Sequence, residues 1–73
     1  MTRDEWIAAF AARLDIEPPS DEELDQILKL AAIAAHASER TAAPVACWIG
    51  GRTRRSPAEL RDIAKEINPG AED

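Results

Sequence analysis

The sequence predicts a small all-α domain, a bundle of four helices arranged around the second one. Three observations support this: apolar residues recur at helical spacing, helix start and stop signals alternate, and no stretch alternates apolar and polar residues as strands do. A chain of 73 residues suffices for one such domain with a thin core. We therefore expect a single helical domain over residues 1–73, frayed from about residue 69 to 73.

The first helix is expected over about residues 3–14. Thr2 and Glu5 have the spacing of a capping box, in which each side chain accepts a hydrogen bond from a backbone N–H of the first turn. Pro18 and Pro19 then forbid any continuation of this helix. The apolar residues in between recur at helical intervals and are Trp6, Ile7, Phe10, Ala11 and Leu14.

The second helix is expected over about residues 21–40. Ser20 and Glu23 form a second capping box, and Asp21 and Glu22 place negative charge at the positive end of the helix dipole. Its apolar residues cover more than half of the circumference, which predicts a central helix covered by the other three. They are Leu24, Ile27, Leu28, Leu30, Ala31, Ile33, Ala34, Ala35 and Ala37.

Two further helices are expected, over about residues 44–50 and 57–67. Pro44 suits the first turn of the third helix, and Gly50 with Gly51 marks its end. Ser56 and Pro57 open the fourth helix as an N-cap and a first-turn proline. The expected core, with Leu28 as a central member, consists of Phe10, Leu14, Leu24, Ile27, Leu28, Ala31, Trp48, Ile49, Leu60, Ile63 and Ile67.

Charge and cysteine content narrow the classes of partner. The net charge is −5, which disfavours DNA or RNA as a partner, because nucleic-acid-binding domains carry a basic face. No apolar stretch resembles a signal peptide or a membrane span, so no membrane association is expected. Cys47 is the single cysteine, which excludes an intrachain disulfide and favours the cytoplasm. A protein partner or self-association is expected to support so thin a core.

A short basic segment interrupts this acidic chain and is the candidate contact site. Arg52, Arg54 and Arg55 carry guanidinium groups that can fork onto phosphate or carboxylate oxygens, and Ser56 opens a helix whose N-terminus favours anions. Two interpretations stay open. The favoured one is charge compensation, with the acidic second helix or another molecule; the other is a dedicated anion site.

No residue combination indicates a reaction, so we expect no catalytic residues, no metal and no cofactor. His36 shares the polar face of its helix with Asp25 and Lys29 and is interpreted as solvated. Cys47 is interpreted as a packing residue, and one cysteine with one histidine cannot supply a structural zinc site. Trp48 lies on an apolar helical face and is expected in the core, with an exposed aromatic contact as the alternative.

A series of short segments follows a recognisable order along almost the whole chain: Glu5-Trp6-Ile7, Leu14-Asp15-Ile16, Ala35-His36, Arg40-Thr41-Ala42-Ala43-Pro44-Val45 and Trp48-Ile49-Gly50. In this order the chain resembles a small uncharacterised helical domain of actinobacteria, which occurs alone or attached to the molybdenum-cofactor guanylyltransferase. The chain departs from the family at Thr41, where relatives often carry proline, and it contains neither the nucleotidyltransferase domain nor a Gly-rich nucleotide loop. The resemblance therefore implies an accessory domain, linked to molybdenum-cofactor metabolism, without the transferase activity.

The expected function is thus a non-catalytic helical protein-interaction or accessory domain. The alternative is a small anion- or nucleotide-binding domain that uses the loop of Arg52, Arg54 and Arg55.

Overall fold

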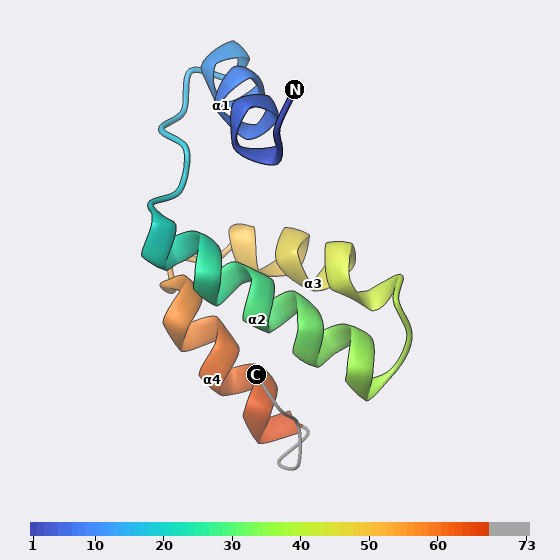
Figure 1. Ribbon diagram of the computed structural model, residues 1–73. Coiled ribbons are helices and arrows are strands. Elements are labelled where there is room, and N and C mark those ends of the chain that lie inside the picture. The colour runs from blue at the N-terminus through green and yellow to red at the C-terminus, as the bar shows by residue number, and fades with distance from the viewer. Residues whose placement is uncertain (68–73) are drawn as a thin grey trace.

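The computed structural model describes residues 1–67, and all of its regular structure is helical within that range. The helices are α1 (Arg3–Arg13), α2 (Asp21–Ala37), α3 (Ala42–Gly51) and α4 (Pro57–Ile67), shown in Figure 1. The prediction of a small all-α bundle is confirmed. The fraying expected from about residue 69 lies outside the described residues.

Both predicted capping boxes are formed. The N–H of Thr2 donates to Oε1 of Glu5 at 2.7 Å, and the N–H of Glu5 donates to Oγ1 of Thr2 at 3.1 Å. The same exchange joins Ser20 and Glu23 at 2.9 and 3.1 Å. These bonds satisfy backbone donors that the first turn of a helix leaves without a partner, so they define where α1 and α2 begin.

The connection between α2 and α3 differs from the prediction. α2 ends at Ala37, three residues earlier than expected, where Oγ of Ser38 donates to the carbonyl of Ala34 at 2.9 Å. α3 begins at Ala42, whose N–H donates to the carbonyl of Glu39 at 2.9 Å. Pro44 is therefore the third residue of α3 and not the first. It is tolerated there because first-turn N–H groups have no partner within the helix.

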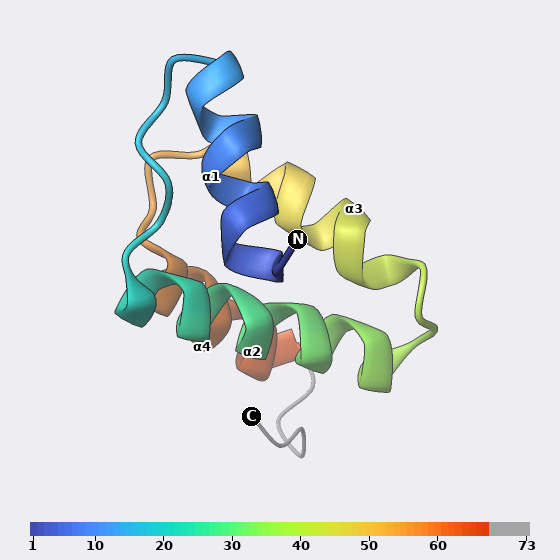
Figure 2. The ribbon, with the colours of Figure 1, turned by 45° about the horizontal axis from the view of Figure 1, so that its top comes forward.

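α2 is the central helix of a three-helix body. It packs extensively against both α3 and α4, as Figures 1 and 2 show. α1 makes no comparable contact with any of these helices and stands apart at the end of the linker of residues 14–20 (Figure 1). The expectation that α1 also covers α2 is therefore wrong.

The backbone of the linker explains why α1 stands apart. Asp15 adopts a left-handed conformation with φ of 57°, which turns the chain sharply after α1. Pro18 and Pro19 fix their own φ angles and restrict the preceding residue to extended conformations. The chain therefore runs in an extended form before it enters α2.

The core is smaller than expected. Among the described residues, the buried apolar side chains are Ala11, Leu30 and Ile33, of which Ile33 is 1% exposed. Part of the expected core is only half-buried: Leu24, Ile27, Ala31, Leu60 and Ile63. The rest of it is exposed, which corrects the prediction for Phe10, Leu14, Leu28, Trp48, Ile49 and Ile67. Helical spacing identifies an apolar face, but it does not state whether another helix covers that face.

Candidate interaction surface

α2, α3 and α4 enclose an apolar groove with a volume of about 650 Å³. The C-terminal half of α2 forms its floor with Leu30 and Ile33, and α3 and α4 form its two walls. Alanines explain why the groove stays open, because a methyl group leaves unfilled the space that a larger side chain would occupy. They are Ala34, Ala37, Ala42, Ala46 and Ala64.

The ends of the groove carry its few polar groups. Oγ of Ser38 donates to the carbonyl of Ala34, and Oγ1 of Thr53 donates to the carbonyl of Gly50 at 2.8 Å. Arg55 is the ionisable side chain among the lining residues that the structure describes. Apart from these groups the lining of the groove is apolar.

Large apolar side chains that are exposed to solvent line the edges of the groove on α3 and α4. Val45 and Ile49 of α3 are each 56% exposed, and Ile67 of α4 is 82% exposed. Sequence periodicity had predicted Ile49 and Ile67 as core residues. The high proportion of alanine in α2 and α3 was the signal for this groove, because small residues cannot fill the space between diverging helices.

The predicted basic site lies in the loop between α3 and α4. Nη1 of Arg55 contacts Oε2 of Glu59 at 2.9 Å, so Arg55 is paired with an acid of α4. Oγ of Ser56 accepts a hydrogen bond from the N–H of Glu59 at 3.2 Å and thereby caps α4. Arg54 is exposed and extends from the same loop. Charge compensation within the loop thus involves α4, and among residues 1–67 no ion pair joins these arginines to the acids of α2.

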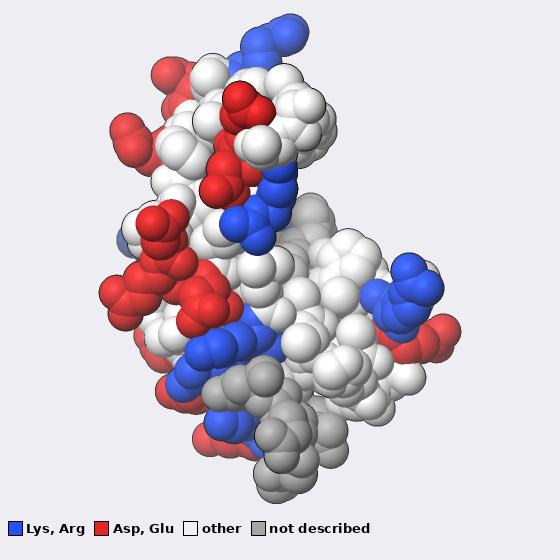
Figure 3. Space-filling model, in the orientation of Figure 1, with Lys and Arg blue, Asp and Glu red and all other residues white. Residues whose placement is uncertain are grey.

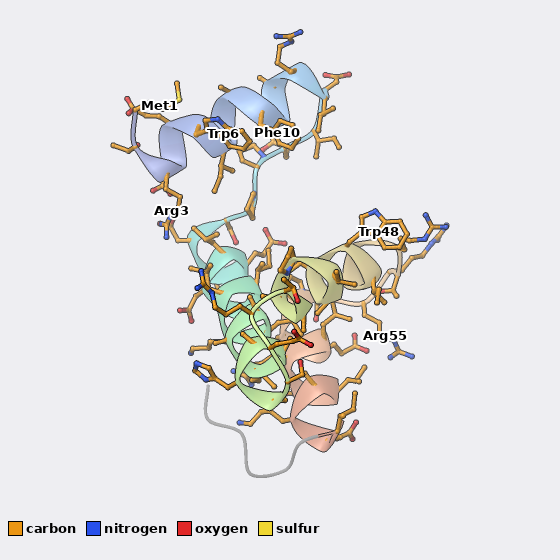
Figure 4. All side chains as sticks on the ribbon, turned by 90° about the vertical axis from the view of Figure 1, so that its right-hand side faces the viewer. Met1, Arg3, Trp6, Phe10, Trp48 and Arg55 are labelled. Carbon is orange, nitrogen blue, oxygen red and sulfur yellow. The ribbon has the colours of Figure 1, made fainter. Side chains whose placement is uncertain are left out.

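Trp48 is an exposed aromatic residue, as the alternative interpretation of the sequence expected. Its side chain is 63% exposed, and Figure 4 shows it at the outer edge of α3. The guanidinium carbon of Arg52 lies over its ring, 4.9 Å from the centroid. This cation–π contact holds Arg52 against α3. Arg52 and Arg55 therefore each contact a side chain of their own chain, Trp48 and Glu59 respectively.

α1 presents a second exposed aromatic surface. The rings of Trp6 and Phe10 are stacked, with centroids 5.0 Å apart and an interplanar angle of 25°. Their side chains are 55% and 53% exposed, and Figure 4 places both on the same side of α1. An amphipathic helix whose large residues face solvent is a candidate contact surface.

Charged side chains are unevenly spread over the face of the molecule seen in Figure 3. Acidic groups gather where α2 begins and along α1, whereas a broad part of the same face is uncharged. On α2, Nζ of Lys29 contacts Oδ2 of Asp25 at 3.1 Å, and His36 is exposed near the end of the helix. The interpretation of His36 as a solvated residue agrees with this placement.

Cys47 is the remaining candidate residue with nucleophilic chemistry. Cys47 is half-buried, and burial raises the pKa of its thiol, which keeps it protonated at neutral pH and weakens it as a nucleophile. Nowhere in residues 1–67 do three His, Cys, Asp or Glu side chains gather in a way that could hold a metal ion. None of the described helices combines the length and apolarity needed to cross a membrane.

The family of this chain is identified by comparison with known proteins. No curated protein and no solved structure matches the chain. A family model described as a domain of unknown function, DUF6457, matches residues 1–71. The chain therefore belongs to the DUF6457 family.

Proposed function

We propose that this chain is a non-catalytic protein-interaction domain that receives an apolar helical face in the groove between α3 and α4. The observation that carries the proposal is the groove itself. It measures about 650 Å³ on a chain of 8.0 kDa, and its open edges carry Val45, Ile49 and Ile67, all more than half exposed. Contiguous exposed apolar surface of this kind marks contact sites.

A helix is the occupant that this shape favours. A groove between two helices takes the apolar side of a third one, with anchoring side chains spaced three or four residues apart. The walls are α3 and α4, of 10 and 11 residues. At 1.5 Å per residue they extend for roughly 15 Å, which corresponds to about three turns of a partner helix.

A binding experiment with a groove variant tests the proposal. The full chain is immobilised beside Val45→Glu and Leu28→Glu, and proteins retained from the native cytosol are identified by mass spectrometry. Val45 lines the groove, whereas Leu28 is a comparably exposed apolar residue of α2 outside it. We expect partners that bind wild type and Leu28→Glu but not Val45→Glu. The proposal fails if no reproducible partner is found, the chain itself included, or if the groove variant retains them all.

The biological setting follows from the sequence resemblance and from composition. We propose an accessory role near molybdenum-cofactor metabolism, because the related actinobacterial domain occurs attached to the guanylyltransferase of that cofactor. A cytoplasmic location is consistent with the single thiol of Cys47. The net charge of −5 favours a protein partner over DNA or RNA. Co-purification of the chain with that enzyme from a native source tests this setting.

The alternative function is the binding of a small anion or nucleotide by the loop of residues 52–56. Its support is Arg54, which is exposed beside the N-terminus of α4. Against it stand Arg55, paired with Glu59, and Arg52, which lies over Trp48. Thermal shift with phosphate and GTP distinguishes the two functions, since stabilisation by either ligand that is lost in Arg54→Ser would favour the anion site.

A further inference from the structure

We infer that the groove between α3 and α4 takes α1 of a second copy of this chain, so that two copies exchange their first helices. This inference rests on the proposed function, because it names the partner of the same groove. It combines the two apolar surfaces that a single chain leaves uncovered.

α1 requires a surface to pack against. It has 11 residues, and isolated helices shorter than about 12–15 residues are marginally stable in water. Trp6, Phe10 and Leu14 follow at four-residue intervals and are 55%, 53% and 53% exposed. Within α1 only Ala11 is buried. Ile7 is half-buried, so the described residues of the same chain cover α1 only in part and leave its large aromatic side chains exposed.

The groove offers the surface that α1 requires. α1 is about 16 Å long at 1.5 Å per residue, which matches the length of the walls formed by α3 and α4. A helix placed between these walls, opposite α2, would complete a four-helix arrangement. Trp6 and Phe10 supply aromatic volume, while the alanines of the groove leave the space to receive it.

The linker favours insertion of α1 from a second copy over insertion of α1 from the same chain. It joins α1 to the beginning of α2, whereas the part of α2 that lines the groove starts only at Leu30. Thr53 and Arg55 of the α3–α4 loop line one end of the groove. Pro18 and Pro19 keep the linker extended, and Figures 1 and 4 show α1 held away from the groove-forming helices. Short, stiff hinge segments of this kind favour the exchange of an element between copies.

The exposed surface of the chain is large enough for such a dimer. The accessible surface is 5725 Å², whereas compact monomers of 8.0 kDa expose about 4,450 Å². The excess is about 1,300 Å² for the chain as a whole. This excess is more than the roughly 800 Å² that each partner buries in a standard interface.

Mass in solution is the first test. Sedimentation equilibrium of the full chain should give 8.0 kDa at low concentration and approach twice that mass as concentration rises. Phe10→Glu on α1 and Val45→Glu in the groove should each raise the dimer dissociation constant about 100-fold, since each buries an unpaired charge in the interface. Leu28→Glu, an exposed apolar residue outside both surfaces, should leave it unchanged. Far-UV circular dichroism confirms that each variant keeps its helices.

Cross-linking identifies which copy supplies the helix. In a Cys47→Ser background, Phe10→Cys and Val45→Cys are made in separate chains, mixed at dimer-forming concentration and treated with a bifunctional maleimide. We expect a product that contains one chain of each kind. When both substitutions stand in one chain, dilution to the concentration that gives 8.0 kDa should abolish the α1–groove cross-link.

Three outcomes would overturn the proposal that two copies exchange α1. An intrachain cross-link in the dilute double variant would mean that α1 closes on its own groove. A dimer lost in Phe10→Glu but intact in Val45→Glu would mean that the α1 faces pair with each other. A chain that stays at 8.0 kDa at all concentrations would exclude self-association altogether. In each case the proposed function still depends separately on whether Val45→Glu loses a captured protein.

Discussion

Gly50 of α3 lies directly against Leu60 of α4, so closely that a Cβ atom at position 50 would be 2.7 Å from Cδ1 of Leu60. Gly50 is buried, and neither it nor Gly51 has a positive φ. The double glycine ends α3, as predicted, but both residues are still helical, and Gly50 permits the contact between two helices. Gly50 and Leu60 both line the groove, so this contact lies where its two walls meet.

Alanine substitutions at the two glycines should differ in their effect on stability. Gly51→Ala meets nothing within 4 Å and should stabilise the fold by about 0.5–1 kcal/mol through helix propensity. Gly50→Ala forces Leu60 to move and should be less stable than Gly51→Ala by about 1–2 kcal/mol. Urea denaturation of both variants measures the difference. Equal stability would show that α4 can shift away from Gly50 without loss.

Truncation of Ile33 should destabilise the chain far more than truncation of Leu28. Ile33 is 1% exposed, so Ile33→Ala should lower the free energy of unfolding by about 2–4 kcal/mol. Leu28 is 48% exposed, so Leu28→Ala should lower it by less than about 1 kcal/mol. Thermal melts of the two variants provide the comparison. A larger effect at Leu28 would restore it to the core position that periodicity alone predicts.

The two capping boxes should differ in what they stabilise. Replacement of either N-cap residue by alanine should lower the stability of its helix by about 1 kcal/mol. Ser20→Ala weakens α2, which contacts both α3 and α4, and should lower the melting temperature by about 4–8 °C. Thr2→Ala weakens α1, which stands apart, and in dilute solution should lower the helix content while leaving the main melt in place. A matching loss of melting temperature in Thr2→Ala would show that α1 is coupled to the body.

Acid should unfold α1 before the rest of the chain. Hydrogen bonding of the Glu5 carboxylate to the backbone and side chain of Thr2 lowers the pKa of Glu5 below its ordinary value. This stabilisation of α1 is complete above the ordinary pKa and is lost as the pH falls through the lowered one. Helix content measured by circular dichroism should fall in that acidic range in wild type. Glu5→Gln keeps an acceptor without the titrating group, so its helix content should change less.

The basic loop should be dispensable for folding. Replacing Arg52, Arg54 and Arg55 together by Ser removes an exposed ion pair and an exposed cation–π contact, which together contribute about 1 kcal/mol or less. Any anion or partner contact through the loop should weaken in a salt-dependent manner. Stability and binding are measured on the same preparation. Unfolding of the triple variant with normal binding by its folded fraction would make the arginines structural residues.

Local structure could be predicted from the sequence because its causes are local. Thr2 with Glu5 and Ser20 with Glu23 form the hydrogen bonds that their spacing predicts, and Pro57 opens α4 at the expected position. A capping box involves residues three apart, and the conformational limits of proline involve only its neighbours. The all-α fold and the central place of α2 follow from such patterns together with helical periodicity.

Only the tertiary structure determines which apolar helix faces are covered by another helix. Trp6 and Phe10 are spaced as core residues are, yet the extended linker leaves their face in solvent. Ile49 was predicted in the core, but it lies on the open edge of a groove because α3 and α4 run apart from the loop that joins them (Figure 1). Periodicity specifies which side of a helix is apolar, whereas helix directions and linker conformation determine what that side meets.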